Sequence, residues 1–344
     1  MKIENLLREN IKTIKAYSSA RDEYKNASAD MVFIDANENP FKTNVNRYPD
    51  PQQTKVKQRL AEIKGVSTTQ ILLGNGSDEV LDLIFRAFCE PNYDNVITLP
   101  PTYGMYKVLA DLNAVDIISV ELDNDFEPKV DEILAVQNNN SKLLFLCSPN
   151  NPTANSFNSK KVEQLIREFN GIVVIDEAYI DFSSQESWLG RLNEFPNLIV
   201  TQTLSKAYGL AGIRLGICYA SGFIISVLNK IKPPYNVNQL TQDKALERLN
   251  EIKEVEDQIA SILKERDLLI SELNSISIIK TIYPSDANFV LAKVDEADLR
   301  YKQLIDKGIV VRNRTTQPLC KNCLRFTVGT PNENKTLIKI LNEL

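Results

Sequence analysis

The chain has 344 residues, 43% of them hydrophobic and 25% charged, values that are ordinary for a globular protein and that predict a large core divided between two domains. The formal net charge is −5 and no long basic block occurs, so nucleic-acid binding is disfavoured. Because the sequence contains no histidine, Ser-His-Asp catalysis, Cys-His catalysis and histidine metal sites are excluded, and proton transfer must depend on Lys, Tyr, Asp or Glu.

The N-terminal segment, residues 1–30, is polar and carries apolar residues at helical spacing, so we expect helical structure that packs as an arm on another surface. Charged residues interrupt the segment throughout, which is unlike a secretory signal. Nowhere does an apolar run approach the roughly 20 residues that a membrane span needs. We therefore expect a cytoplasmic protein with no membrane partner.

Turn-forming residues surround the first predicted strand. An extended stretch ends in N-E-N-P at 37–40, and a second turn is marked by Y-P-D at 48–50. A short apolar strand at 71–73 is followed by G-N-G-S-D-E at 74–79 and then by a helical pattern. A glycine turn at a helix N-terminus directs free N–H groups toward one point. This turn is therefore either a phosphate-binding site or a helix cap whose acidic residues complement the dipole.

Three further apolar strands are each followed by polar residues. The strand at 96–99 leads to Tyr103, which is either a ligand contact or an ordinary core aromatic residue. The strand at 143–147 leads to N-N-P-T at 150–153, and the strand at 172–175 ends at Asp176. The carboxyl ends of strands are where α/β proteins bind ligands, so these polar residues are candidates for one site.

The segment 198–216 carries the strongest chemical signal. An apolar strand begins it, Lys206 follows the strand, and Arg214 comes eight residues later in a run rich in Gly and Ala. A lysine beside a buried strand has its pKa lowered by burial, which makes it a nucleophile that forms Schiff bases. Arginine suits a phosphate group. This combination indicates pyridoxal 5′-phosphate (PLP), and a strand at 217–220 is expected to complete the large sheet.

The C-terminal part of the chain predicts a compact α+β unit. Helical spacing from 237 to 273 predicts a long connecting helix or a helix pair. Short strands are expected at 289–292, 309–311 and 324–328, with helices at 296–307 and 332–344. Arg325 lies within an apolar strand and therefore needs either a salt-bridge partner or a ligand. Cys320 and Cys323 form a C-x-x-C pair without the further ligands of a zinc site, so we expect reduced thiols and no metal.

These motifs carry a resemblance to a known family. T-L-S-K-A at 203–207, followed by G-L-A-G-I-R at 209–214, resembles the PLP-lysine signature of the aspartate-aminotransferase-like enzymes. Together with N-E-N-P, Y-P-D, P-T-Y at 101–103, N-N-P-T and D-x-x-Y at 176–179, the chain is most similar to the histidinol-phosphate aminotransferases. Ala154 departs from the family pattern, which has glycine after N-N-P-T.

The resemblance implies an α/β fold of the PLP-dependent aspartate-aminotransferase type (fold type I). In this arrangement a large PLP-binding domain with a mostly parallel sheet spans residues 31–235. A smaller split α+β domain comprises residues 236–344 and the N-terminal arm, residues 1–30. The resemblance also implies a homodimer with shared active sites.

The resemblance further implies the roles of individual residues. Lys206 binds PLP and moves a proton, Asp176 keeps the pyridine nitrogen protonated, and Tyr179 reaches the phenolic oxygen. The remaining cofactor-binding residues are Gly76, Ser77, Asp78, Tyr103, Asn151, Thr203, Ser205, Arg214 and Tyr48 of the partner subunit. The substrate-binding residues are Tyr17, Asn37, Arg312 and Arg325.

The activity that the resemblance implies is transamination between L-histidinol phosphate and 2-oxoglutarate, a step of histidine biosynthesis. A related PLP enzyme, such as an aromatic aminotransferase or a threonine-phosphate decarboxylase, would share every cofactor residue. A PLP-sensing regulator on the same fold is a more distant alternative. It is disfavoured because such regulators carry an additional DNA-binding domain, whereas this sequence begins with the family's arm.

Overall fold

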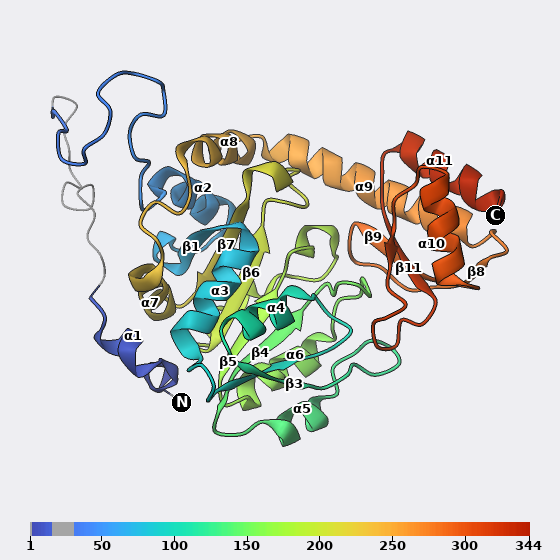
Figure 1. Cartoon of the computed structure of the whole chain (residues 1–344), viewed down its shortest axis with the longest axis horizontal. Helices are drawn as coiled ribbons and strands as arrows, with labels where there is room; N and C mark the ends of the chain where they lie inside the picture. The colour runs from blue at the N-terminus through green and yellow to red at the C-terminus, as the bar shows by residue number, and fades with distance from the viewer. Residues whose placement is uncertain (1, 16–30) are drawn as a thin grey trace.

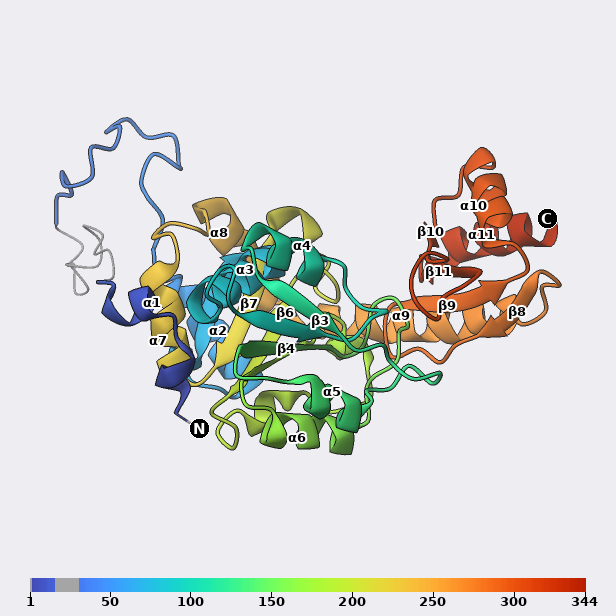
Figure 2. The same ribbon diagram turned by 60° about the horizontal axis from the view of Figure 1, so that its bottom comes forward.

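The computed structural model describes residues 2–15 and 31–344, which form two β-sheets and their covering helices (Figure 1). The larger sheet has seven strands in the order β1-β7-β6-β5-β4-β2-β3, and the smaller has four in the order β10-β11-β9-β8. The two sheets lie toward opposite ends of the molecule, and the long helix α9 (Ile252–Leu273) runs between them (Figures 1 and 2).

The large sheet is mostly parallel, as the sequence predicted. Parallel pairs join β2 to β3, β2 to β4, β4 to β5 and β5 to β6, whereas β7 is antiparallel to both β1 and β6. Its strands are β1 (Ile71–Asn75), β2 (Asn95–Thr98), β3 (Asp116–Ser119), β4 (Ser141–Cys147), β5 (Ile172–Asp176), β6 (Leu198–Thr203) and β7 (Leu215–Ala220).

Helices cover both faces of this sheet, which explains why its central strands are apolar on both sides. In β4, Leu144 and Leu146 belong to the core on one face, while Leu143 and Phe145 belong to the core on the other. One face packs against α2 (Thr54–Lys64), α5 (Val130–Val136), α6 (Ser159–Glu168) and α8 (Gln239–Leu249). The other face packs against α3 (Gly76–Phe88), α4 (Met105–Leu112) and α7 (Gly222–Ile231).

The smaller sheet is antiparallel and packs one face against the C-terminal helices. Leu324 and Phe326 of β11 lie in a core with residues of α9, α10 and α11, whereas Cys323 belongs to the core of the large sheet. Alternate residues of β11 therefore face opposite sides. The elements are β8 (Ile279–Ile282), β9 (Phe289–Val294), α10 (Ala297–Asp306), β10 (Arg312–Asn313), β11 (Cys323–Thr327) and α11 (Pro331–Asn342).

Three local expectations need comment. The helical segment 237–273 is a helix pair, α8 and α9, which was one of the two alternatives. The strand expected at 309–311 is wrong, because pairing with β11 begins only at Arg312 and Val310 is largely exposed. The sequence pattern did not predict β3 and β8, two strands at sheet edges whose residues are partly or fully exposed and so lack an apolar run.

The described part of the N-terminal segment packs on the large sheet's side of the molecule. Residues 3–6 form the 3-10 helix η1 (Ile3–Leu6), and residues 9–13 form α1 (Glu9–Thr13). Their apolar side chains join the core around α3, and the Arg8 N–H donates to the Ala87 carbonyl oxygen at 3.2 Å. This placement differs from the expected one in the smaller domain. The segment lies there because its apolar side chains pack against those of α3. The division of the chain into domains otherwise stays a prediction.

All five cysteines are free and buried. None of the helices in residues 2–15 and 31–344 combines the length and apolar composition required to cross a bilayer.

Candidate active site

The carboxyl ends of β4, β5 and β6 meet at one edge of the large sheet. Cys147 at the end of β4 pairs in register with Asp176 at the end of β5, and Asp176 pairs with Thr201 of β6. The loops that follow these strands surround a cavity. Its lining comprises Ser77, Asp78, Tyr103, Cys147, Asn151, Asp176, Ala178, Tyr179, Thr203, Ser205, Lys206 and Arg214.

Lys206 lies in the turn after β6, with its ammonium nitrogen 5.6 Å from the centroid of the Tyr179 ring. The turn is held by hydrogen bonds from the Ser205 N–H to the Thr203 Oγ1 at 3.1 Å and from the Gly209 N–H to the Lys206 carbonyl oxygen at 3.1 Å. The side chain reaches solvent on one side, but burial of the remainder lowers its pKa, and the charge of Arg325 lowers it further. A larger share of Lys206 is therefore the neutral, nucleophilic amine.

Asp176 lies at the floor of the cavity and is 3% exposed. Its carboxylate accepts hydrogen bonds from the Tyr106 hydroxyl at 3.0 Å and from the Ala178 N–H at 3.2 Å. Burial nevertheless raises the pKa of Asp176 to about 6, because the ionised carboxylate loses its hydration. A buried acid of this kind is suited to a cationic partner inside the cavity, such as a protonated ring nitrogen.

The N-terminus of α3 and Arg214 form a cradle at the side of the cavity. Gly76 has a φ of +79°, and a Cβ at this position would lie 2.6 Å from the Arg214 Nη2, so the guanidinium occupies the space that a side chain would fill. The Gly76 N–H donates to the Arg214 carbonyl oxygen at 3.0 Å, which fixes Arg214 against the helix start. Free N–H groups and a guanidinium that converge in this way fit a phosphate group.

Asp78 and Tyr103 lie beside this cradle. The Tyr103 hydroxyl donates to Asp78 at 3.1 Å, and the Arg214 Nη2 is 3.6 Å from the other Asp78 oxygen. Burial, together with the charge of Asp78, raises the pKa of Tyr103, so its phenol stays protonated. The Thr203 Oγ1 donates to the Ser205 Oγ at 3.0 Å.

Arg325, on strand β11 of the smaller sheet, contacts a residue that lines the cavity. Its Nη1 donates to the Asn151 Oδ1, and its guanidinium carbon lies 4.9 Å from the centroid of the Phe289 ring. Burial, Arg314 and Arg312 lower the pKa of Arg325 to about 10. A desolvated guanidinium held this way is available to an anion entering the site.

The structure places the predicted residues unequally. The predicted residues in the loops of the large sheet line the cavity together. Gly76 lies beneath Arg214. Arg312 is exposed on β10. Asn37 and Tyr48 line a separate hollow with the start of α8, and the Tyr48 ring stacks on Tyr235 at 4.4 Å. Within this chain they are therefore not part of the cavity. Tyr17 lies outside the described residues.

Two residues near the site were missed. Tyr106, in the first turn of α4, is fully buried and donates to Asp176; its ring stacks on Phe145 at 4.7 Å. Nothing in the sequence separates it from a core aromatic residue. Arg314 follows β10, and its distance of two residues from Arg312 is the signal that would have placed both side chains on one face.

Comparison with known proteins gives a consistent family. The family described as aminotransferase class I and II matches residues 22–341. The chain is 62% identical to a histidinol-phosphate aminotransferase of Flavobacterium johnsoniae and 60% identical to that of Christiangramia forsetii, over 99% of this chain and 98% of each relative. Among solved structures, a histidinol-phosphate aminotransferase from Sinorhizobium meliloti in complex with PLP superposes with a TM-score of 0.80. It is 24% identical over 87% of this chain and 83% of that chain, so it shows the fold.

The matched region contains both sheets and every residue that lines the cavity. The lysine, the buried acid and the anion cradle are thus found in a chain that resembles these relatives from end to end. This chain therefore belongs to the class I and II aminotransferases, where it groups with the histidinol-phosphate aminotransferases.

Proposed function

We propose that this protein transfers the amino group of L-histidinol phosphate to 2-oxoglutarate with PLP as its cofactor, giving imidazole acetol phosphate and glutamate. The observation that carries the proposal is the single cavity in which Lys206, the buried Asp176 and the Arg214 cradle converge. The full-length similarity to histidinol-phosphate aminotransferases supports the choice of substrate.

The residues present fit the cofactor. The N–H groups at the start of α3, the hydroxyls of Thr203 and Ser205, and Arg214 would hold its phosphate. Asp176 would pair with the ring nitrogen, and Tyr103 would contact the ring face. Asn151 and Tyr179 would bind the phenolic oxygen. When bound, PLP supplies an electron sink that lowers the barrier to removing a proton from the substrate carbon.

Lys206 then acts as the proton carrier. Its lowered pKa leaves more of the amine unprotonated, so it could move the proton between the substrate carbon and the C4′ atom of the cofactor. The Tyr179 ring under the ammonium restricts where the side chain can move.

Arg325 would bind the anionic end of both substrates. The two half-reactions bring a phosphate monoester and a carboxylate to the same place, and a planar guanidinium pairs with either group through two parallel hydrogen bonds. Arg312, the other arginine that the family resemblance assigns to the substrate, would add a second positive charge.

We further propose a homodimer in the cytoplasm, in which Tyr48 of the partner subunit reaches the cofactor phosphate and Asn37 reaches the substrate. The support is the segment 31–50, which extends away from the body of the chain (Figure 1). Its apolar side chains Val32, Ile34 and Phe41 are 83%, 91% and 77% exposed, a state that a second subunit would relieve.

An amine-donor panel tests the substrate assignment. The PLP-loaded protein is given 2-oxoglutarate with histidinol phosphate, phenylalanine, tyrosine, aspartate or threonine phosphate, and glutamate formation and carbon dioxide release are measured. We expect the highest kcat/KM for histidinol phosphate and no carbon dioxide. Preference for an aromatic amino acid, or decarboxylation of threonine phosphate, would contradict the proposal.

A further inference from the structure

The loop between β4 and α6 contains a strained backbone position. This loop comprises residues 148–158, and Asn151 within it lines the active-site cavity. Three residues later, Ala154 is fully buried and has a φ of +72°. An L-residue with a Cβ atom is disfavoured in this left-handed region, which glycine adopts freely. The loop therefore needs contacts that hold Ala154 in this conformation.

Asp286 of the smaller sheet supplies two such contacts. Its N–H donates to the Ala154 carbonyl oxygen at 2.8 Å, and its Oδ2 accepts from the Ser156 N–H at 3.0 Å. Asp286 lies between β8 and β9, so these hydrogen bonds join the smaller sheet to a loop of the large one. Because Ser156 is buried and the acceptor is a carboxylate, the second bond is a strong one.

Hydrogen bonds within the loop connect Ala154 to Asn151. The Ala154 N–H donates to the Asn150 carbonyl oxygen at 2.8 Å, and the Asn150 N–H donates to the Asn155 carbonyl oxygen at 2.8 Å. These two bonds tie the residue before Asn151 to the segment that Asp286 holds. The position of Asn151 therefore depends on the conformation at Ala154.

We propose that Asp286 is a positioning residue whose carboxylate holds the strained conformation at Ala154 and thereby fixes Asn151 at the phenolic oxygen of PLP. Without the carboxylate, Ala154 can leave the left-handed region, which relieves its strain and displaces Asn151. With glycine at this position there is no strain to relieve, so the loop keeps its shape with or without the carboxylate. The role of Asn151 rests on the proposed function, whereas the hold on Ala154 does not.

A double-mutant cycle of Asp286→Ala and Ala154→Gly tests the hold on Ala154 in the PLP-free protein. Hydrogen exchange is measured by mass spectrometry in a peptide covering residues 148–155, which excludes the Ser156 amide that bonds directly to Asp286. We expect Asp286→Ala to speed exchange in this peptide about 10-fold, as for a lost hydrogen bond to a charged acceptor, and less than about 2-fold when Ala154→Gly is present.

Two further variants control this measurement. Asp286→Asn removes the charge but keeps an acceptor oxygen, so exchange should stay close to that of the wild type. Asp298→Ala removes an exposed acid of α10 and should have no effect. Equal acceleration by Asp286→Ala in both backgrounds, or none in either, would refute the hold on Ala154.

The PLP-loaded protein tests the step from Ala154 to Asn151. A hydrogen bond to the phenolic oxygen favours its ionised form, so losing that bond should raise the pH midpoint of the cofactor's visible absorbance change. We expect Asp286→Ala to raise this midpoint by about 0.5 pH unit or more. Asp286→Asn and the double variant should restore the wild-type value.

The outcomes separate this inference from the substrate assignment. An unchanged midpoint in Asp286→Ala, despite faster exchange in the loop, would show that Asp286 does not position Asn151 and would overturn the inference. If histidinol phosphate is not turned over but the exchange and absorbance results hold, the proposed function fails and the inference stands.

Discussion

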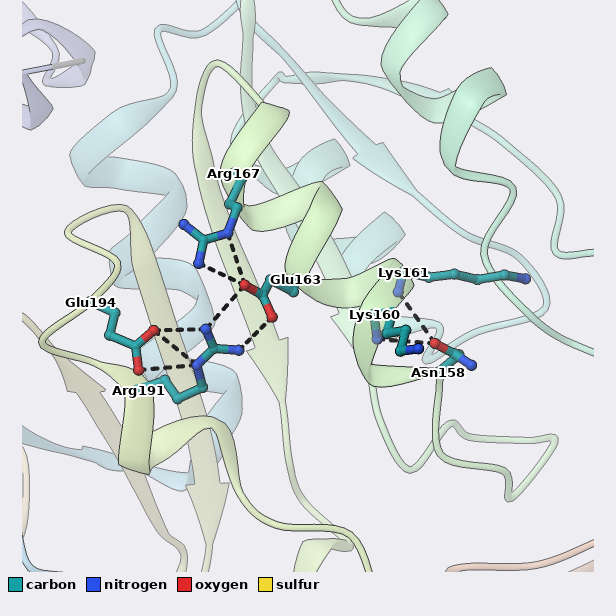
Figure 3. A network of polar contacts seen from close by, with 7 residues as sticks. All are labelled: Asn158, Lys160, Lys161, Glu163, Arg167, Arg191 and Glu194. Atoms are coloured by element: carbon teal, nitrogen blue, oxygen red, sulfur yellow. Dashed lines mark hydrogen bonds and ion pairs between the residues drawn. The ribbon is translucent and has the colours of Figure 1, made fainter.

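Two groups of arginines in this molecule show opposite uses of the same side chain. At the surface, Arg191 lies 2.7 Å from Glu163 and 2.7 Å from Glu194, and Arg167 lies 2.6 Å from Glu163 (Figure 3). These pairings raise the pKa of Arg191 and lower the pKa of Glu163 to about 2. Each charge of this network already has its partner.

The arginines of the β10–β11 hairpin are in the reverse condition. Burial lowers the pKa of Arg314 and Arg325, and the positive charges of other arginines lower it further. Exposed pairs add little to stability and fix local geometry, whereas desolvated cations without acids cost stability and retain their capacity for a ligand. Unpaired charge, rather than the number of charges, therefore marks the functional region.

The largest effect should come from Lys206→Ala. In the proposed function the amine is both the attachment point of PLP and the proton carrier, so we expect turnover to fall below detection while the chain stays folded. Steady-state assays with circular dichroism as the folding control measure this. Residual turnover within about 10-fold of the wild-type value would place the chemistry elsewhere.

Arg325→Lys should give the next largest effect. The positive charge is kept, but the planar fork that pairs with Asn151 and with an anion is lost, so both half-reactions should slow about 30-fold or more. Arg191→Lys is the matched control on the surface and should leave both rates unchanged. A silent Arg325→Lys variant would mean that the substrate anion is held by other residues.

Asp176→Asn should separate stability from function. The folded-state pKa of Asp176, about 6, is above its ordinary value of 3.8. In the PLP-free protein the protonated carboxyl therefore contributes to the stability of the folded state below about pH 4, and this contribution is lost as the pH rises through 6. The loss amounts to about 3 kcal/mol at most. Asp176→Asn should therefore be more stable than wild type at pH 8 without PLP, although its activity falls.

Denaturant titrations of the PLP-free proteins at pH 5 and pH 8 measure this difference. Tyr106→Phe sharpens the test, because loss of the Tyr106 hydrogen bond should raise the pKa of Asp176 further and steepen the pH dependence. Identical pH profiles for wild type and Asp176→Asn would show that the carboxyl is not the group responsible.

The smallest effect is expected in the surface network. Glu163→Gln removes the acid shared by Arg167 and Arg191, but these side chains are hydrated, so the denaturation midpoint and both half-reactions should change little. High salt should reduce even this difference. A loss of stability comparable with that in the core would contradict the contrast between the two regions.

The sequence predicted the site residues best where a strand is followed directly by a polar loop. Asp176 and Lys206 follow apolar runs of a parallel sheet, and such loops converge by topology alone, so their shared cavity could be predicted. Contacts between residues far apart in the sequence could not be predicted in this way. The start of β10 at Arg312 depends on pairing with β11, and the hydrogen bond from Tyr106 to Asp176 joins residues 70 positions apart. The N-terminal helices were predicted from spacing, but the surface that they cover was not.

The most direct test of the account is chemical labelling of the cofactor's attachment point. The PLP-loaded protein is reduced with borohydride, digested and analysed by mass spectrometry, with Lys206→Ala as the control. The account predicts one pyridoxyl-modified peptide, carrying the label on Lys206, and no such peptide in the variant. A label on another lysine, or none in a protein that turns over, would contradict the claim that the cavity after β6 is the catalytic site.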